Sequence, residues 1–381
     1  MRSPIKRQSG GKRPGSVVVY AVVMMVVLTG FVSLAVDFGR YELCHTQLYT
    51  ACMAAARAGA ANLPNGSSAA QAAAIATAGE NAIDGQFVVA SSNLTLTVQF
   101  LLWVSNTNFT VLTPANYSQA NAISVSAQYT VPLVFAQVIG FPTKPAIESS
   151  TAMLVTTSST QSVGATSNLW LSGEPTGTQA SQPDPNYAGQ GVNPDHKWQY
   201  DIAGPVGGSA SDGEPYESPV QASITVVPGS TITLSNVSGL ASNDGDVSPN
   251  ASATGSQPGG FNIEDDAASG GVSEHGIADE TAPVNSMNAV FLNNSLPDGT
   301  SAPAPLDFST QAERDYTNLD PQLKQPFYVG TGVNSSGQTQ SVVVPQGATR
   351  LFLGTMDGWE WSNNLGSFSV TITQSKVSTV Q

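Results

Sequence analysis

The sequence predicts an α+β N-terminal domain, made of a long membrane-spanning helix and a small sheet, followed by an all-β sandwich. Three observations support this fold class. Residues 15–36 carry no charge. Alanine-rich helical periodicity then continues to about residue 61. After Lys197, helical periodicity is nearly absent and short alternating apolar runs dominate.

These patterns divide the chain of 381 residues into five segments. We expect a basic cytoplasmic tail (1–14), a transmembrane helix (15–36), an α+β domain (37–157), a linker or long loop (158–195) and a β-sandwich (196–377). The linker segment is rich in Ser, Thr, Gly, Pro and Gln, which is typical of loops. Its "NLWL" stretch is the exception, because it has the character of a strand that belongs to the sandwich.

The apolar segment is long enough to cross a membrane as a helix. At about 1.5 Å per residue, residues 15–36 would measure about 33 Å, against about 30 Å for a hydrocarbon core. Five of the 13 Lys and Arg residues precede this segment, which favours a cytoplasmic N-terminus and a periplasmic or extracellular body. We therefore expect a single-pass protein of the inner or cytoplasmic membrane.

A cleaved signal peptide is the alternative for this segment. Ser33-Leu34-Ala35 resembles a small-x-small cleavage site. The apolar run is, however, longer than the usual apolar region of a signal peptide, about 7–15 residues. A retained anchor is the interpretation that we prefer.

The helix is expected to continue beyond the membrane. One helix over residues 15–61 would be about 70 Å long, and "NLPNGS" would end it before a second helix in "SAAQAAAIATAGENAI". Small alanine side chains let helices approach closely. We therefore predict that copies of the chain can form a homo-oligomer through the N-terminal helix. Cys44 and Cys52 lie about 12 Å apart on such a helix, too far to pair in one chain. They are either core residues or an intermolecular pair.

The expected strands follow in two groups. The first group lies between residues 86 and 157 and comprises "NLTLTVQFLLWV", "AISVSAQYTVPLVF" and "STAMLVTT". In the second group, apolar residues alternate over residues 220–226, a turn is expected at Pro228-Gly229, and strand character resumes at Ile232. Further strands are expected in "NAVFL", "QSVVV", "TRLFLG" and "SFSVTIT".

Composition and motifs exclude several functions. Beyond residue 13 the chain has eight basic and 27 acidic residues, so we expect no nucleic-acid partner. The three histidines lie far apart in the sequence, and no His/Cys cluster has the spacing of metal ligands. The sequence also contains no nucleophile elbow and no phosphate loop. Carboxylates such as Glu264 and Asp265 could in principle hydrolyse glycosides, but a solvated acidic loop is commoner. We expect that the protein is not an enzyme.

The stretch "GTMDGWEWSNNLGSFSV" holds the strongest candidate site. Asp357, Asn363 and Asn364 offer hard oxygen atoms, the ligands that Ca²⁺ prefers. The alternative is an ordinary turn, in which Asp-Gly and Asn-Asn are common. Trp359 and Trp361 could stack on a sugar as ligand-binding residues, or simply pack in the protein.

Residues 13–157 resemble the TadE/TadG-like proteins of Flp (tight-adherence) pilus assembly. The matching residues are an Asp-x-Gly just after the span, a Thr-x-Leu and an Ala-Gly-Ala: Asp37, Gly39, Thr46, Leu48 and residues 58–60. "VPLVFAQVIG" also fits this family. The resemblance implies a pilin-like sheet, membrane association and pilus or envelope proteins as partners.

Two departures from that family affect processing and the role of Asp37. Cys52-Met53 stands where the family often has Ala-Asp, and the span lacks the early Glu tied to prepilin processing. We therefore expect a permanent anchor. For Asp37, a charge at the membrane boundary and a defined electrostatic role in assembly are both open.

Residues 200–373 resemble the PA-I-type galactophilic lectin sandwich, a jelly-roll. The resemblance rests on "VVPGSTITLSNVSGLASNDG", "GIADETAPVNSMNAVFL" and the run from "SSGQTQ" to "GSFSV". It implies a Ca²⁺ site in which Asp357 and the Asn363-Asn364 pair bind the ion before a Gly-Ser-Phe strand. A further main-chain carbonyl ligand falls on Asn243.

The sugar-reading residues of that lectin family are not reproduced. The comparable stretch here is "SEHGI", in which His275 is the candidate ligand-binding residue, so galactose specificity does not carry over. The predicted function is a membrane-anchored, pilus-assembly-like envelope protein that displays a lectin-like, Ca²⁺-dependent carbohydrate-binding domain for adhesion or surface structure. The alternative is a purely structural pilus or envelope subunit without a ligand.

Overall fold

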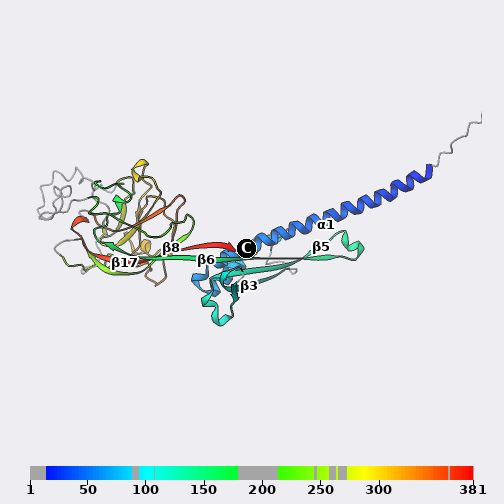
Figure 1. Ribbon diagram of the computed structural model, residues 1–381, viewed down its shortest axis with the longest axis horizontal. Coiled ribbons are helices and arrows are strands. Elements are labelled where there is room, and N and C mark those ends of the chain that lie inside the picture. The colour runs from blue at the N-terminus through cyan, green and yellow to red at the C-terminus, as the bar shows by residue number, and fades with distance from the viewer. Residues whose placement is uncertain are drawn as a thin grey trace, which may run out of the picture. The chain divides into compact units, whose positions relative to one another are not determined.

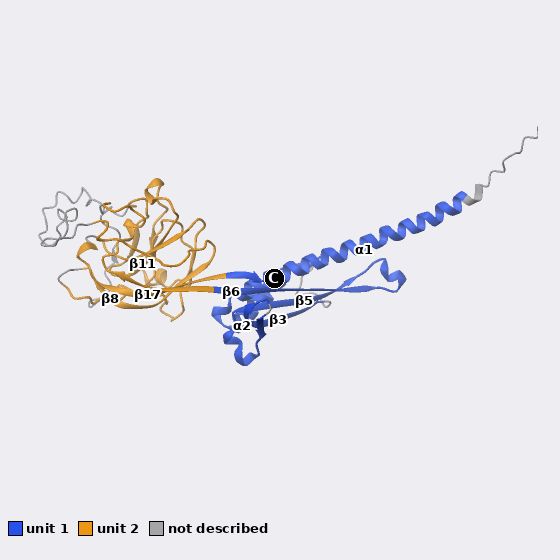
Figure 2. Cartoon of the chain, viewed as in Figure 1, with its two compact units in different colours: residues 1–155, 377–381 blue, residues 156–376 orange. Residues whose placement is uncertain are grey.

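The chain forms two compact units (Figures 1 and 2). Unit 1 comprises residues 1–155 and 377–381, and unit 2 comprises residues 156–376. The structure is a computed structural model, and it describes residues 14–87, 94–106, 108–178, 213–243, 247–256, 263–264, 273–358 and 361–380.

Helix α1 (Pro14–Ala61) is one continuous helix of 48 residues, which confirms the long helix expected from the sequence. Its N-terminal part is strongly apolar, with a window of mean hydropathy 2.6, and none of that window is buried in the protein. Among the described residues it is the one helix that is long and apolar enough to cross a membrane. This property suggests a single-pass anchor.

The second half of α1 packs against α2 (Ser67–Gly79), which follows the short helix η1 (Leu63–Asn65). Ala70, Ala74 and Ala78 recur at intervals of four and are all buried, because residues at this spacing share one face of a helix. A Cβ atom on Gly59 would lie 3.1 Å from the Cβ atom of Ala74. The two helices are therefore as close as their small residues allow.

The main sheet of unit 1 is antiparallel, in the order β6-β5-β3-β4. These strands are β3 (Leu94–Ser105), β4 (Asn108–Val111), β5 (Ala122–Pro132) and the first part of β6 (Thr143–Gly164), and a small hairpin of β1 (Ala82–Ile83) and β2 (Gln86–Phe87) precedes them. Val125, Tyr129 and Val131 alternate with more exposed residues on β5 and face the helices. An α+β unit is thus confirmed.

Two short helices interrupt the strand connections of unit 1. Helix η3 (Pro114–Gln119) lies between β4 and β5, and η4 (Ala136–Ile139) lies in the turn between β5 and β6.

Cys44 and Cys52 are unpaired and buried in the core. Burial raises the pKa of the Cys52 thiol to about 12, and also raises that of Cys44. Both behave as core residues.

Unit 2 is mostly β and has two main sheets. One has the order β13-β15-β8-β17-β6 and the other β14-β11-β16-β7, with a small third sheet, β12-β10-β9. Their bounds are β7 (Val220–Gln221), β8 (Thr231–Ser242), β9 (Ile263–Glu264), β10 (Glu280–Pro283), β11 (Met287–Leu292), β12 (Leu306–Asp307), β13 (Asn318–Leu319), β14 (Phe327–Tyr328), β15 (Ser341–Val343), β16 (Arg350–Thr355) and β17 (Leu365–Val380). Helices η5 (Leu169–Leu171), η7 (Pro297–Gly299), α3 (Gln311–Arg314) and η8 (Trp361–Asn363) connect them.

The two main sheets share one hydrophobic core. Ile232 and Phe368 come from one sheet, and Phe291 and Leu353 come from the other. Side chains from two facing sheets form such a core in a β-sandwich. The jelly-roll, lectin-like arrangement of the strands stays a prediction.

The predicted linker differs from the structure at its start. Strand β6 continues to Gly164, and the η5 residues Leu169–Leu171 are fully buried in the core of unit 2. The Ser- and Thr-rich composition suggested a loop, but these hydroxyls pair across strands: Thr160 Oγ1 lies 3.0 Å from Thr371 Oγ1. Residues 179–195 of the predicted linker lie outside the described residues.

Candidate functional site

Strand register brings Asn243 and Asn364 to the same end of one sheet. Strands β8 and β17 pair antiparallel, with Ser242 opposite Leu365. Asn243 directly follows Ser242 and Asn364 directly precedes Leu365. These two residues, distant in sequence, therefore lie opposite each other where the ladder ends.

Asn285 links Asp357 to the same corner. The backbone N–H of Asn285 donates to the Met356 carbonyl at 2.7 Å, directly before Asp357. The side-chain amide of Asn285 donates to Asn243 Oδ1 at 3.1 Å. Sequence reasoning missed Asn285. Its positive φ of 64° is a conformation that Asn tolerates better than most residues, but this could not be inferred from the sequence.

Asn364 brings an unsatisfied oxygen to this corner. Its side chain is 4% exposed, and its Nδ2 donates to the Ala165 carbonyl at 3.1 Å. Its Oδ1 is buried and has no hydrogen-bond partner. A buried amide oxygen without a partner is costly, and a cation is one group that would satisfy it.

Asp357 supplies a buried carboxylate to the corner. It is 5% exposed, and its Oδ1 accepts from the Gly358 N–H at 2.7 Å. Asn363 ends η8, beside Asn364 in the sequence. The predicted ligands Asn243, Asp357, Asn363 and Asn364 thus belong to adjoining segments, and their oxygens are the type that suits Ca²⁺.

Trp361 is a core residue. It is 2% exposed, its Nε1 donates to the Thr355 carbonyl at 2.9 Å, and its ring centroid lies 5.6 Å from that of Trp170. In this position the ring of Trp361 faces the protein interior. It therefore packs in the core and is not exposed to stack on a sugar. Trp359 lies outside the described residues.

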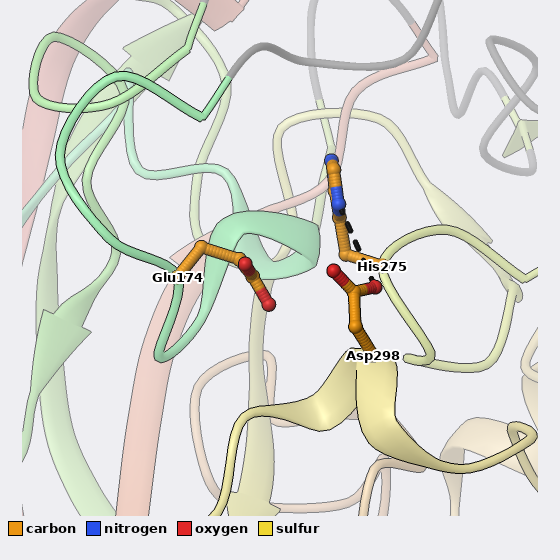
Figure 3. A group of neighbouring side chains, drawn as sticks. All are labelled: Glu174, His275 and Asp298. Atoms are coloured by element: carbon orange, nitrogen blue, oxygen red, sulfur yellow. Dashed lines mark ion pairs between the residues drawn. The ribbon is translucent and has the colours of Figure 1, made fainter.

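His275 belongs to a different cluster, which Figure 3 shows. One potential ligand atom from each of Glu174, His275 and Asp298 lies within 4.8 Å of the others. His275 Nδ1 is 3.8 Å from Asp298 Oδ1. None of the predicted Ca²⁺ ligands belongs to this cluster.

The electrostatics of this second cluster disfavour the charge on Glu174. Burial raises the pKa of Glu174 and nearby Asp298 raises it further, while His275 lowers it. Glu174 Oε1 is also buried without a hydrogen-bond partner. The mixed imidazole and carboxylate donors suit a transition metal better than Ca²⁺. Sequence reasoning found His275 alone, because 124 residues separate Glu174 from Asp298 and no motif joins them.

Asp37 occupies a defined site just beyond residues 15–36. It is 3% exposed, and its carboxylate accepts from the N–H groups of Val134, Phe135 and Ala136 at 2.9, 2.9 and 2.6 Å. Burial raises its pKa, but these three donors outweigh burial and hold the pKa below the ordinary value. Asp37 therefore fixes the turn between β5 and β6 to α1.

Two family models match the N-terminal unit. Residues 15–62 match the family described as "Putative Flp pilus-assembly TadE/G-like", and residues 58–152 match "Putative Tad-like Flp pilus-assembly". The N-terminal unit is Tad pilus-assembly-like. The matched residues run from α1 into β6 and include Asp37 and the turn that it binds. No curated protein and no solved structure matches the chain.

Proposed function

We propose that the protein is a single-pass envelope protein of Flp pilus assembly, anchored by residues 15–36 with its N-terminus in the cytoplasm. The two family matches over unit 1 carry this proposal, together with the unburied apolar half of α1. Unit 2 is then displayed on the far side of the membrane, where it serves adhesion or surface structure. The family resemblance gives no reason to expect catalysis, and an enzymatic role is not proposed.

The anchor is tested by the mass of the mature chain and by membrane extraction. A retained anchor predicts an intact N-terminal segment in the mass spectrum and resistance to alkaline carbonate extraction. It also predicts that protease added to spheroplasts digests unit 2. A mature chain that begins directly after Ala35, recovered in the soluble fraction, would contradict the anchor and support a signal peptide.

Unit 2 is proposed to bind Ca²⁺ through Asp357, Asn363, Asn364 and the main-chain carbonyl of Asn243. The buried, unpartnered Oδ1 of Asn364 supports this site, together with the nearby Asp357 carboxylate. One carboxylate gives limited affinity, comparable with extracellular Ca²⁺ modules of Kd about 10⁻⁴–10⁻³ M. At about ten to a hundred times Kd, binding would stabilise unit 2 by about 1.4–2.7 kcal/mol.

The metal test compares matched charge changes in unit 2. The thermal unfolding temperature of the full chain in detergent should rise when Ca²⁺ replaces a chelator. Asp357→Asn should abolish this rise. Asp320→Asn, which alters an exposed aspartate, should retain it. Variant His275→Ala should also retain the Ca²⁺ response, since His275 belongs to the other cluster. Equal unfolding with Ca²⁺ and with chelator would favour the purely structural subunit.

Carbohydrate binding is the finer form of this proposal. The burial of Trp361 removes one of the two aromatic rings proposed to stack on a sugar, so the Ca²⁺ ion itself would have to bind the sugar hydroxyls. A glycan array probed with the full chain in Ca²⁺ and in chelator tests this point. Binding that requires Ca²⁺ and disappears in Asp357→Asn would support a lectin, whereas a blank array would remove it.

A further inference from the structure

The turn between β5 and β6 exposes an apolar surface in unit 1. Residues 133–142 read "LVFAQVIGFP" and contain no charged residue. Val138 is 82% exposed and Phe141 is 64% exposed. The other exposed apolar side chains of this turn are Val134, Phe135 and Ile139. We call this surface the apolar turn.

Contacts with α1 place the apolar turn on the membrane side of unit 1. Asp37 binds the turn at residues 134–136. Further along α1, the Tyr41 ring lies 3.7 Å from Lys144 Nζ, and His45 Nδ1 lies 2.8 Å from Glu148 Oε1. Strand β6 therefore runs in the same direction as α1, away from the membrane, and the turn before it points toward residues 15–36 (Figure 1).

The side chains next to the apolar turn are those typical of a membrane–water interface. Tyr and Lys are favoured there because each has an apolar body and a polar end. Tyr41 and Lys144 contact each other just beyond Asp37 and the turn. On α1 the uncharged stretch is followed by the buried Asp37, then Arg40 and Tyr41, and on the hairpin it is followed by Lys144.

The backbone of the turn is prepared for an environment without water. Exposed N–H groups that lack a partner are costly in lipid. Asp37 accepts from those of Val134, Phe135 and Ala136. Four more N–H groups donate to carbonyls within the turn, those of Leu133, Val138, Gly140 and Phe141. Pro142 has no N–H to satisfy. Most of the turn's donors therefore need no water.

We propose that the apolar turn inserts into the membrane beside α1 and contacts the lipid acyl chains of the leaflet nearest unit 1. The proposal rests on the proposed anchor, whose apolar surface is continuous with the turn across the Asp37 contact. Lipid is the occupant because the surface has no charge and lies at the end of the span. The turn would act as a second membrane contact that fixes the orientation of unit 1.

Fluorescent labels in the full chain test the insertion. Val138→Cys, Val26→Cys and Val104→Cys would each carry an environment-sensitive dye, with the chain in lipid nanodiscs at one copy per disc. Native Cys44 and Cys52 are buried with raised pKa values and should react poorly, and the wild-type chain gives the blank. Quenching lipids would carry the doxyl group either near the headgroup or near the end of the acyl chain.

The three labels have distinct expected results. At Val138 we expect a blue shift and greater loss of emission with the shallow quencher, since interfacial segments enter about 5–10 Å. At Val26, in the span, the deep quencher should be the more effective. Val104 is 69% exposed and lies near the end of β3 that is remote from the apolar turn, because Leu94 pairs with Tyr129 and Leu101 with Ala122. This control should show neither shift nor quenching.

Two outcomes would overturn the proposal while leaving the anchor intact. Water-like emission at Val138 with normal quenching at Val26 would show that the turn stays in solution. A blue shift at Val138 without lipid quenching would show that protein covers the turn. Loss of quenching at Val26 would instead mean that the anchor itself fails.

Discussion

The cores of the two units are built on different principles. In unit 1, alanine and glycine at the contact of α1 and α2 let two backbones approach each other. In unit 2, large side chains fill the space between sheets, as where the Phe291 and Phe327 rings stack at 5.5 Å. Unit 1 should therefore tolerate enlargement poorly, and unit 2 should tolerate truncation poorly.

Buried carboxyl groups show the same contrast. Asp37 in unit 1 accepts three backbone N–H donors and is held as an anion. Glu280 in unit 2 is fully buried, and neither of its carboxyl oxygens has a hydrogen-bond partner. Burial, and secondly the charge of Asp279, raise the pKa of Glu280 well above its ordinary value. One carboxyl group organises its surroundings as a charge, and the other is accommodated as a neutral acid.

Truncation in the core of unit 2 should have the largest effect. Phe291→Ala removes a fully buried ring and should lower the free energy of unfolding of unit 2 by about 3–5 kcal/mol. Hydrogen exchange of the strand peptides would measure the loss in unit 2 separately from unit 1. Phe109→Ala, at a half-exposed position in unit 1, should cost about 1 kcal/mol or less. Equal losses would show that the buried Phe291 ring stabilises unit 2 no more than an exposed ring stabilises unit 1.

Enlargement at the helix contact of unit 1 should have the next largest effect. A Cβ atom on Gly59 would lie 3.0 Å from Ile123 Cδ1 and 3.2 Å from the Ala70 carbonyl oxygen. We expect Gly59→Leu to lower the free energy of unfolding of unit 1 by about 1–3 kcal/mol. Gly39→Leu is the control on the same helix, because nothing lies within 4 Å of its Cβ position. A harmless Gly59→Leu variant, measured by exchange of α2 amides, would show that this contact is loose.

Replacement of Glu280 should alter the pH dependence of unit 2. With a raised pKa in the folded state, its contribution to stability is complete below the unfolded pKa of about 4.3 and is lost as pH rises. The loss cannot exceed about 1.4 kcal/mol per pH unit for one proton. Glu280→Gln should therefore gain stability relative to wild type as the pH rises above the unfolded pKa, by no more than that slope. Parallel stability curves for the two proteins would show that Glu280 does not titrate in this way.

Replacement of Asp37 should have the smallest and most local effect. Asn keeps the shape but offers one acceptor oxygen, so amide exchange over residues 133–142 should accelerate while the strands of unit 1 stay protected. Because the folded pKa of Asp37 is lowered, its contribution is present at neutral pH and is lost on acidification below the ordinary value of 3.8. Glu42→Gln, at an exposed position of the same helix, should leave this exchange unchanged.

Local patterns predicted the elements well, and they failed where contacts are distant in sequence. The continuous helix α1, helix α2 and most of the predicted strands are present. The start of the predicted linker was wrong, because Ser and Thr in β6 pair with β17 and a loop composition does not reveal such a partner. The alternation over residues 220–226 is visible in burial, although strand pairing covers only Val220–Gln221.

The site residues also divide into those that the local sequence groups together and those that only the fold brings together. Asp357, Asn363 and Asn364 lie within one short loop, so the sequence alone could group them. Their approach to Asn243 depends on the register of β8 and β17 and on the bridging Asn285, which nothing in the sequence marks. The cluster of Glu174, His275 and Asp298 has no local pattern at all. Such a site becomes visible only when the chain is folded.

Because α1 is continuous, the rotation of its apolar segment about the helix axis is coupled to the position of the Asp37 contact. Its 48 residues form one helix, so the span and the Asp37 contact share a single rotational register. Inserting one residue between them would rotate the contact about 100° around the helix axis and move it about 1.5 Å along that axis. With the proposed anchor, the side of the span that faces lipid and the side of unit 1 that faces the membrane would therefore be set together, and unit 1 would follow any tilt of the span.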